Sequence, residues 1–167
     1  KKITLLVAML FATLTIAQNI KIVEIDADQT STDDMEFLEI LTESSNQSLN
    51  GYIVVFYNGN SDQSYRTLDL TGFSSDSNGY FIIGSDLFPG ADIIMGPDNT
   101  IQNGADAIAI YSADAANFPD GTSVTSSGLV DAVVYGTSDD DDLELLAGLN
   151  QTTQWDENQN GLKDVES

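Results

Sequence analysis

The sequence predicts an all-β protein with the architecture of a sandwich, and three features of the chain predict it. Its apolar runs are short and rich in Ile, Val, Phe and Tyr, the residues that favour strands. Clusters of Gly, Asn, Asp and Ser separate these runs, and such clusters form turns. After residue 17, the best helical spacing covers only Leu143–Leu149, which is about two turns.

Eight strands are expected, each bounded by turn residues. The predicted strands are Ile20–Ala27, Glu36–Thr42, Tyr52–Asn58, Tyr65–Leu70, Tyr80–Gly84, Asp92–Met95, Ala105–Tyr111 and Leu129–Tyr135. The turns that favour this division are Asn58-Gly59-Asn60, Asn78-Gly79, Asn103-Gly104 and Asp120-Gly121. Several short strands at this spacing are typical of one sandwich domain.

The side-chain pattern of individual strands predicts where the core lies. The first two strands are joined by a polar loop and are expected to pair. The strand Tyr52–Asn58 is apolar on both faces, so we expect it to be covered on both sides. In Ala105–Tyr111, alanines alternate with Ile108 and Ile110, so the isoleucine face should point into the core.

The N-terminal segment is typical of an export signal. Residues Ile3–Ala17 form an apolar stretch after Lys1-Lys2 and end in Thr15-Ile16-Ala17, which has small residues at the positions before a cleavage site. We expect residues 1–17 to be a signal peptide and the protein to be secreted or held at the cell surface. An uncleaved N-terminal anchor is the alternative, although the polar pair Gln18-Asn19 arrives early for a membrane helix.

The composition excludes many functions. The chain has no histidine and no cysteine, which excludes Ser-His-Asp triads, HExxH zinc sites, thiol nucleophiles and disulfides. The 27 acidic residues outnumber the 5 basic ones and give a net charge of −22, so direct binding to nucleic acid or anionic lipid is not expected. We therefore predict no enzymatic activity, no membrane insertion after cleavage, and a monomer. Carboxylate and backbone oxygens remain as ligands for a hard cation such as calcium.

Several motifs, in this order and spacing, resemble the lamin tail domain family. They are Val23-Glu24-Ile25, Glu36-Phe37-Leu38-Glu39-Ile40, Leu49-Asn50-Gly51-Tyr52, the segment GYFIIG at 79–84, the segment NGADAIAIY at 103–111 and the segment VDAVVYG at 130–136. The resemblance implies an immunoglobulin-like β-sandwich over residues 18–167, of the secreted bacterial type, with no catalytic residues of its own. Because such domains usually continue into a final strand, we expect this one to be truncated at its C-terminal end.

A calcium loop is the first candidate metal site. Oxygen ligands fall at positions 1, 3, 5, 7 and 9 of such a loop, namely Asp156, Asn158, Asn160, the carbonyl of Leu162, and Asp164. Gly161 stands at position 6, where the loop turns sharply. Position 12 is Ser167 rather than a bidentate Glu. The alternative interpretation is a solvated polar loop that turns at Asn160-Gly161.

A carboxylate cluster between the first two strands is the second candidate calcium site. It consists of Asp26, Asp28, Asp33, Asp34 and Glu36. Pairing of the strands would bring these groups close together, so either they fan into solvent or a cation lies among them. The run Asp139–Asp142 is expected to be solvated, or to add its charge to the site near Asp156.

The function predicted from the sequence is that of a secreted, non-catalytic binding or structural module stabilised by calcium, whose partner is an unidentified protein or cell-surface polymer. One alternative is an accessory domain or fragment of an extracellular nuclease or phosphatase whose catalytic domain is absent. The second alternative, a carbohydrate-binding module, rests on fold analogy. Trp155 is a candidate surface platform for a sugar or partner, or else a lid over one end of the sandwich.

Overall fold

The computed structural model describes residues 19–29, 32–97 and 99–157. The predicted signal peptide 1–17 lies outside the described residues. So do Asn158, Asn160, Leu162 and Asp164 of the predicted calcium loop. Within the described ranges, no helix is both long enough and apolar enough to cross a membrane.

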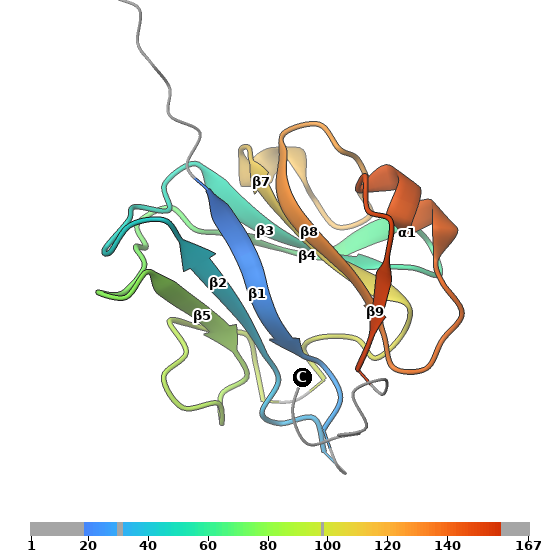
Figure 1. The fold of residues 1–167 in the computed structure, drawn as a ribbon, viewed down its shortest axis with the longest axis horizontal. Helices are drawn as coiled ribbons and strands as arrows, with labels where there is room; N and C mark the ends of the chain where they lie inside the picture. The colour runs from blue at the N-terminus through green and yellow to red at the C-terminus, as the bar shows by residue number, and fades with distance from the viewer. Residues whose placement is uncertain (1–18, 30–31, 98, 158–167) are drawn as a thin grey trace, which may run out of the picture.

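Two β-sheets face each other across a common core (Figure 1). The four-stranded sheet has the order β1 (Ile20–Asp26), β2 (Phe37–Thr42), β5 (Tyr80–Gly84) and β6 (Ile93–Ile94). The five-stranded sheet has the order β4 (Gln63–Asp69), β3 (Tyr52–Asn58), β7 (Asp106–Ser112), β8 (Leu129–Gly136) and β9 (Gln154–Asp156). The predicted β-sandwich architecture is therefore confirmed.

All eight predicted strands are present, and most of their ends differ from the prediction by one or two residues. The short helix is confirmed as α1 (Leu143–Gly148), which begins where the Asp142 side chain accepts the N–H of Leu145 at 2.8 Å. A 3₁₀ turn, η1 (Ala115–Asn117), and the strand β9 were not predicted. β9 has only three residues, which are too few to show an alternating pattern in the sequence. It forms by parallel pairing with β8.

The core between the sheets confirms the predicted orientation of β7, because Ile108 and Ile110 are fully buried there. The other face of the five-stranded sheet is buried as well. Ala107 and Ala109 of β7 lie in a second apolar cluster with Leu145 and Leu149 from the region of α1. This second layer explains why β3 is apolar on both faces, as the sequence predicted.

The largest fully buried side chains are divided between the two apolar clusters. They are Tyr57, Tyr111, Tyr135, Phe56, Phe81, Ile20, Leu38, Ile40, Leu49, Ile53, Leu70 and Ile83. In the second cluster, the Tyr57 and Tyr111 hydroxyl oxygens lie 2.9 Å apart, and the Tyr111 hydroxyl donates to the Thr125 carbonyl. The buried hydroxyl groups are therefore satisfied within the cluster, as buried polar groups must be.

Replacing Ile108 with alanine should destabilise the fold by about 2–5 kcal/mol, because it leaves a cavity between the two sheets. Urea unfolding followed by circular dichroism measures this change in the free energy of unfolding. Ile94→Ala is the matched control, since Ile94 is 63 % exposed on β6 and its loss should cost less than about 0.5 kcal/mol. Equal effects of the two substitutions would contradict the assignment of the core.

Candidate functional site

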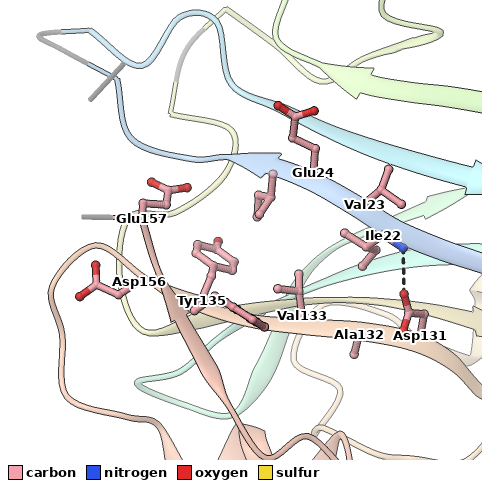
Figure 2. A pocket seen from close by; sticks show the side chains of 11 residues that line it. Ile22, Val23, Glu24, Asp131, Ala132, Val133, Tyr135, Asp156 and Glu157 are labelled. Carbon is pink, nitrogen blue, oxygen red and sulfur yellow. Dashed lines mark hydrogen bonds between the residues drawn. The ribbon is translucent and has the colours of Figure 1, made fainter. Parts of the chain in front are cut away.

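Glu157 meets the first acidic loop at one end of the sandwich. Glu157 directly follows β9, and its Oε1 accepts the backbone N–H of Ala27, just after β1, at 2.8 Å. Asp26 and Asp28 lie close enough to Glu157 to raise its pKa by repulsion. Asp156, the first residue of the predicted calcium loop, directly precedes Glu157 at this end of the sandwich (Figure 2).

Glu36 is fully buried at the start of β2, where it holds a distant loop in place. Its two oxygens accept the N–H of Thr100 at 2.6 Å, the hydroxyl of Thr100 at 2.7 Å and the N–H of Ile101 at 3.0 Å. Burial raises the pKa of Glu36, and these hydrogen bonds oppose that shift. Glu36 thus acts as a structural acceptor.

Amide N–H groups donate to three other carboxylates of the first acidic loop, those of Asp26, Asp28 and Asp33. Asp33, which is buried, accepts the N–H of Gln29 at 2.9 Å and the side-chain amide of Asn103 at 2.8 Å. Asn103 also donates to Asp28 at 3.4 Å, and the Gln29 side chain donates to Asp26 at 2.7 Å. Burial, and then the nearby charge of Asp33, raise the pKa of Asp26. The loop is thus closed by hydrogen bonds from glutamine and asparagine.

Asp34 differs from its neighbours because its hydrogen bond to another segment is made by its backbone carbonyl. Its carbonyl accepts the hydroxyl of Ser85, next to the end of β5, while its side chain is half-buried. Across the described ranges, no group of three or more carboxylates is arranged so that it could hold a metal ion. A metal site here would therefore have to include backbone carbonyls, side-chain amides, water, or residues outside the described ranges.

Glu157 was not among the candidate ligands predicted from the sequence, and neither were Glu24 and Asp131. The Oε2 of Glu157 is buried and accepts no hydrogen bond. Burial raises the pKa of Glu157 to about 7. Hydrogen bonds from the backbone of Ala27 and Asp28 oppose this shift, and the charges of Asp26 and Asp28 add to it. In a calcium loop Glu157 would occupy position 2, which the loop pattern does not assign to a ligand. Only the fold, which places Ala27 against it, reveals its surroundings.

The run Asp139–Asp142 lies beside Gly59 and Asp106, where it helps to line a shallow depression. Asp142 caps α1, and its backbone N–H donates to the Gln154 side chain at 2.8 Å. Asp106 accepts the N–H of Gly59 at 2.8 Å, and its pKa is raised by burial and further by the charges of Asp139 and Asp142. The interpretation of this run as solvated holds for residues 139–141, which are exposed, whereas Asp142 is half-buried.

A groove of about 480 Å³ lies between β1 on one side and β8 and β9 on the other (Figure 2). Its apolar lining consists of Ile22, Val23, Ile25, Ala132, Val133, Tyr135 and Trp155. Its charged lining is entirely acidic and consists of Glu24, Asp131, Asp156 and Glu157. Trp155 pairs in register with the buried Tyr135, yet it is 66 % exposed. The indole therefore forms part of an accessible wall.

Two carboxylates bridge the groove at its ends. Asp131 of β8 accepts the N–H of Ile22 at 2.8 Å, and Glu157 accepts the N–H of Ala27 at the other end. Both bonds join the edge strand of the four-stranded sheet to the five-stranded sheet. Burial raises the pKa of Asp131, while its hydrogen bonds and the charge of Lys21 lower it. The bridges thus tie the open side of the sandwich together.

Fold and site together define a two-sheet β protein with an acidic groove along its open side. Comparison of the chain with protein-family models, with curated proteins and with solved structures found no match.

The raised pKa of Glu157 predicts a pH-dependent contribution to stability. Its pKa is about 7 in the folded chain and 4.5 in the ordinary exposed state, so folding favours the protonated form. The stabilisation is complete below about pH 4.5 and is lost as the pH rises through about 7. Glu157→Gln lacks this titration. In calcium-free buffer, the melting temperature of wild type relative to that of Glu157→Gln should fall over this interval.

Thermal melts at closely spaced pH values test this prediction. Glu43→Gln serves as the control, because Glu43 is exposed and does not line the groove. The difference between wild type and this control should show no comparable step across the interval. A difference between wild type and Glu157→Gln that stays constant with pH would contradict the prediction.

Proposed function

We propose that this chain is an exported, non-catalytic binding or structural module of the lamin tail type, with an immunoglobulin-like sandwich that calcium stabilises. Two observations support the family. The two packed sheets agree with that architecture, and the resembling segments contribute to β1, β2, β3, β5, β7 and β8. The apolar segment Ile3–Ala17 after Lys1-Lys2 supports export.

The observation that carries the non-catalytic role is the use of the buried carboxylates. Glu36 and Asp131 accept backbone N–H groups from distant segments. Asp33 accepts the N–H of Gln29 in its own loop and the side-chain amide of Asn103, so all three carboxylates hold the fold together. A general acid or base must exchange its proton with a substrate at an accessible position. Carboxylates whose oxygens already accept such hydrogen bonds are better suited to stabilising the fold than to transferring protons.

The surroundings of Glu157 support the calcium proposal. Its buried Oε2 lacks a donor, and Asp26 and Asp28 lie nearby with like charge. A cation at this point would satisfy the oxygen and neutralise the repulsion. Asp156 is the neighbouring residue, and the remaining predicted ligands belong to residues 158–167. Calcium binds six to eight oxygen ligands, so the loop and the cluster together suit it better than either alone.

Two alternative functions are considered beside the main proposal. As an accessory domain or fragment of an extracellular nuclease or phosphatase, the chain would leave the chemistry to a separate domain. As a carbohydrate-binding module, it would use Trp155, whose 66 % exposed indole beside a groove suits the stacking of a sugar ring. The acidic lining does not favour either alternative over the main proposal.

Calcium should raise the melting temperature of the chain from Gln18 to Ser167. An ion present at 100 times its dissociation constant adds about 2.7 kcal/mol, which is several degrees for a domain of this size. Scanning calorimetry in EDTA and then in millimolar calcium measures the shift, and sodium chloride of matched ionic strength controls for screening. Glu157→Gln should reduce the calcium shift, whereas Glu43→Gln should leave it intact. An unchanged midpoint would contradict the proposal.

The purified chain should release no product from phosphate monoesters, phosphate diesters or aryl glycosides above the buffer rate, with or without calcium. The physical reason is the structural occupation of its buried carboxylates. Chromogenic substrates and liquid chromatography of the products provide the measurement. Activity that co-purifies with the chain through two separate columns would contradict the non-catalytic role.

A further inference from the structure

We propose that the groove between β1 and β9 binds an extended peptide of a partner protein, in which basic side chains flank an apolar one. The inference deepens the proposed role as a binding module and rests on it. Three features of the groove carry it, namely the strand edges that border it, the sign of its charge, and its exposed apolar wall.

Two strand edges border the groove. β1 is the outermost strand of the four-stranded sheet, and β9 is the outermost strand of the five-stranded sheet. The N–H groups of Ile22 and Ala27 point away from β2 and already donate to the Asp131 and Glu157 carboxylates, so only the backbone between these two bridges is left to pair with a peptide. The alternation of the strand and its bulge at Val23 turn the backbone of Ile25 to the same side. An extended peptide can add to such an edge by pairing with its backbone.

The length of the groove suits a short peptide. The two carboxylate bridges are separated by the stretch from Ile22 to Ala27, which spans about 16 Å at roughly 3.3 Å per residue. This length accommodates about five residues in extended conformation. The volume of about 480 Å³ falls within the range of functional pockets, roughly 300–1,000 Å³.

The charge of the lining determines the kind of partner. All four charged residues that line the groove are acidic. The basic residues of the described ranges are Lys21 and Arg66. The charge of Lys21 acts on Asp131 at one end of the groove, whereas Arg66 donates to the carbonyl of Met95, which is not part of the lining. With a net charge of −22, a second copy of this chain or an acidic peptide is repelled. A peptide with Arg or Lys beside the groove has the complementary charge.

The exposed apolar wall provides the anchor. Trp155 is 66 % exposed and Val23 is 46 % exposed, and they line the same groove. An apolar side chain of the peptide would cover Val23 and Ile25, while a neighbouring Arg would stack on the indole as a cation on an aromatic ring. A sugar would also stack on Trp155, but it would use neither the strand edges nor the sign of the charge. The peptide therefore accounts for more of the site.

Trp155 is the only tryptophan of the chain, so its fluorescence reports on the groove directly. The probe is a six-residue peptide of alternating arginine and valine with blocked ends. We expect a saturable change in Trp155 emission that weakens as sodium chloride is added. Two control peptides are used. One alternates glutamate and valine, and the other is the arginine peptide with alternate backbone nitrogens methylated, which cannot pair with a strand edge. Neither control should bind measurably.

A charge-matched pair of variants locates the binding surface. Glu24→Gln with Asp156→Asn removes two carboxylates from the lining, and Glu43→Gln with Asp120→Asn removes two exposed ones elsewhere. The first pair should weaken binding about two- to fivefold for each carboxylate, in line with roughly 0.4–1 kcal/mol for an exposed charge pair. The second pair should bind as wild type does. Melting temperatures confirm that both variants are folded.

Four results would overturn the inference. The first is unchanged fluorescence with every peptide, and the second is equal binding of the methylated peptide. The third is binding of neutral glycans on an array that Trp155→Ala abolishes, and the fourth is a dimer in sedimentation velocity that buries Trp155. Each would leave the non-catalytic role standing. Activity in the hydrolase assays would overturn that role without bearing on the groove.

Discussion

Carboxylates that accept backbone N–H groups from distant segments are the interaction on which this fold depends. The chain has 27 acidic residues and only 5 basic ones, so ion pairs can neutralise few of its charges. Asp131 and Glu157 fasten β1 to the opposite sheet, and Glu36 fastens the loop before β7. Acidic side chains thus join distant segments of a protein whose net charge is negative.

The strands could be predicted because each is a local pattern. The alternation in β7 identified Ile108 and Ile110 as core residues, and turn residues marked most strand ends. The layer that covers the other face of β7 is not visible locally, since its leucines come from α1, some forty residues later. β9 was missed for a related reason, because three residues that pair in parallel with β8 have no period to detect.

The candidate site was predictable only in part. The crowding of carboxylates after β1 follows from the pairing of β1 with β2, which the sequence indicated. Their partners do not follow, because Thr100 and Asn103 lie some seventy residues from the carboxylates that they contact. Glu157 escaped notice since a loop pattern describes one segment, whereas its environment is created by Ala27 from the opposite end of the domain. Burial and proximity are properties of the fold.

The bonds that close the open side of the sandwich also govern the order in which it can form. They join residues 109 and 130 positions apart, one from β1 to β8 and the other from the end of β1 to the end of β9. Contacts of such long range slow folding, because the entropy of closing a long loop is lost before the contact forms. Of the described strands, β1 comes first along the chain and is therefore among the last to be fastened on its outer side. Until β8 and β9 are in place, that edge of the domain stays open.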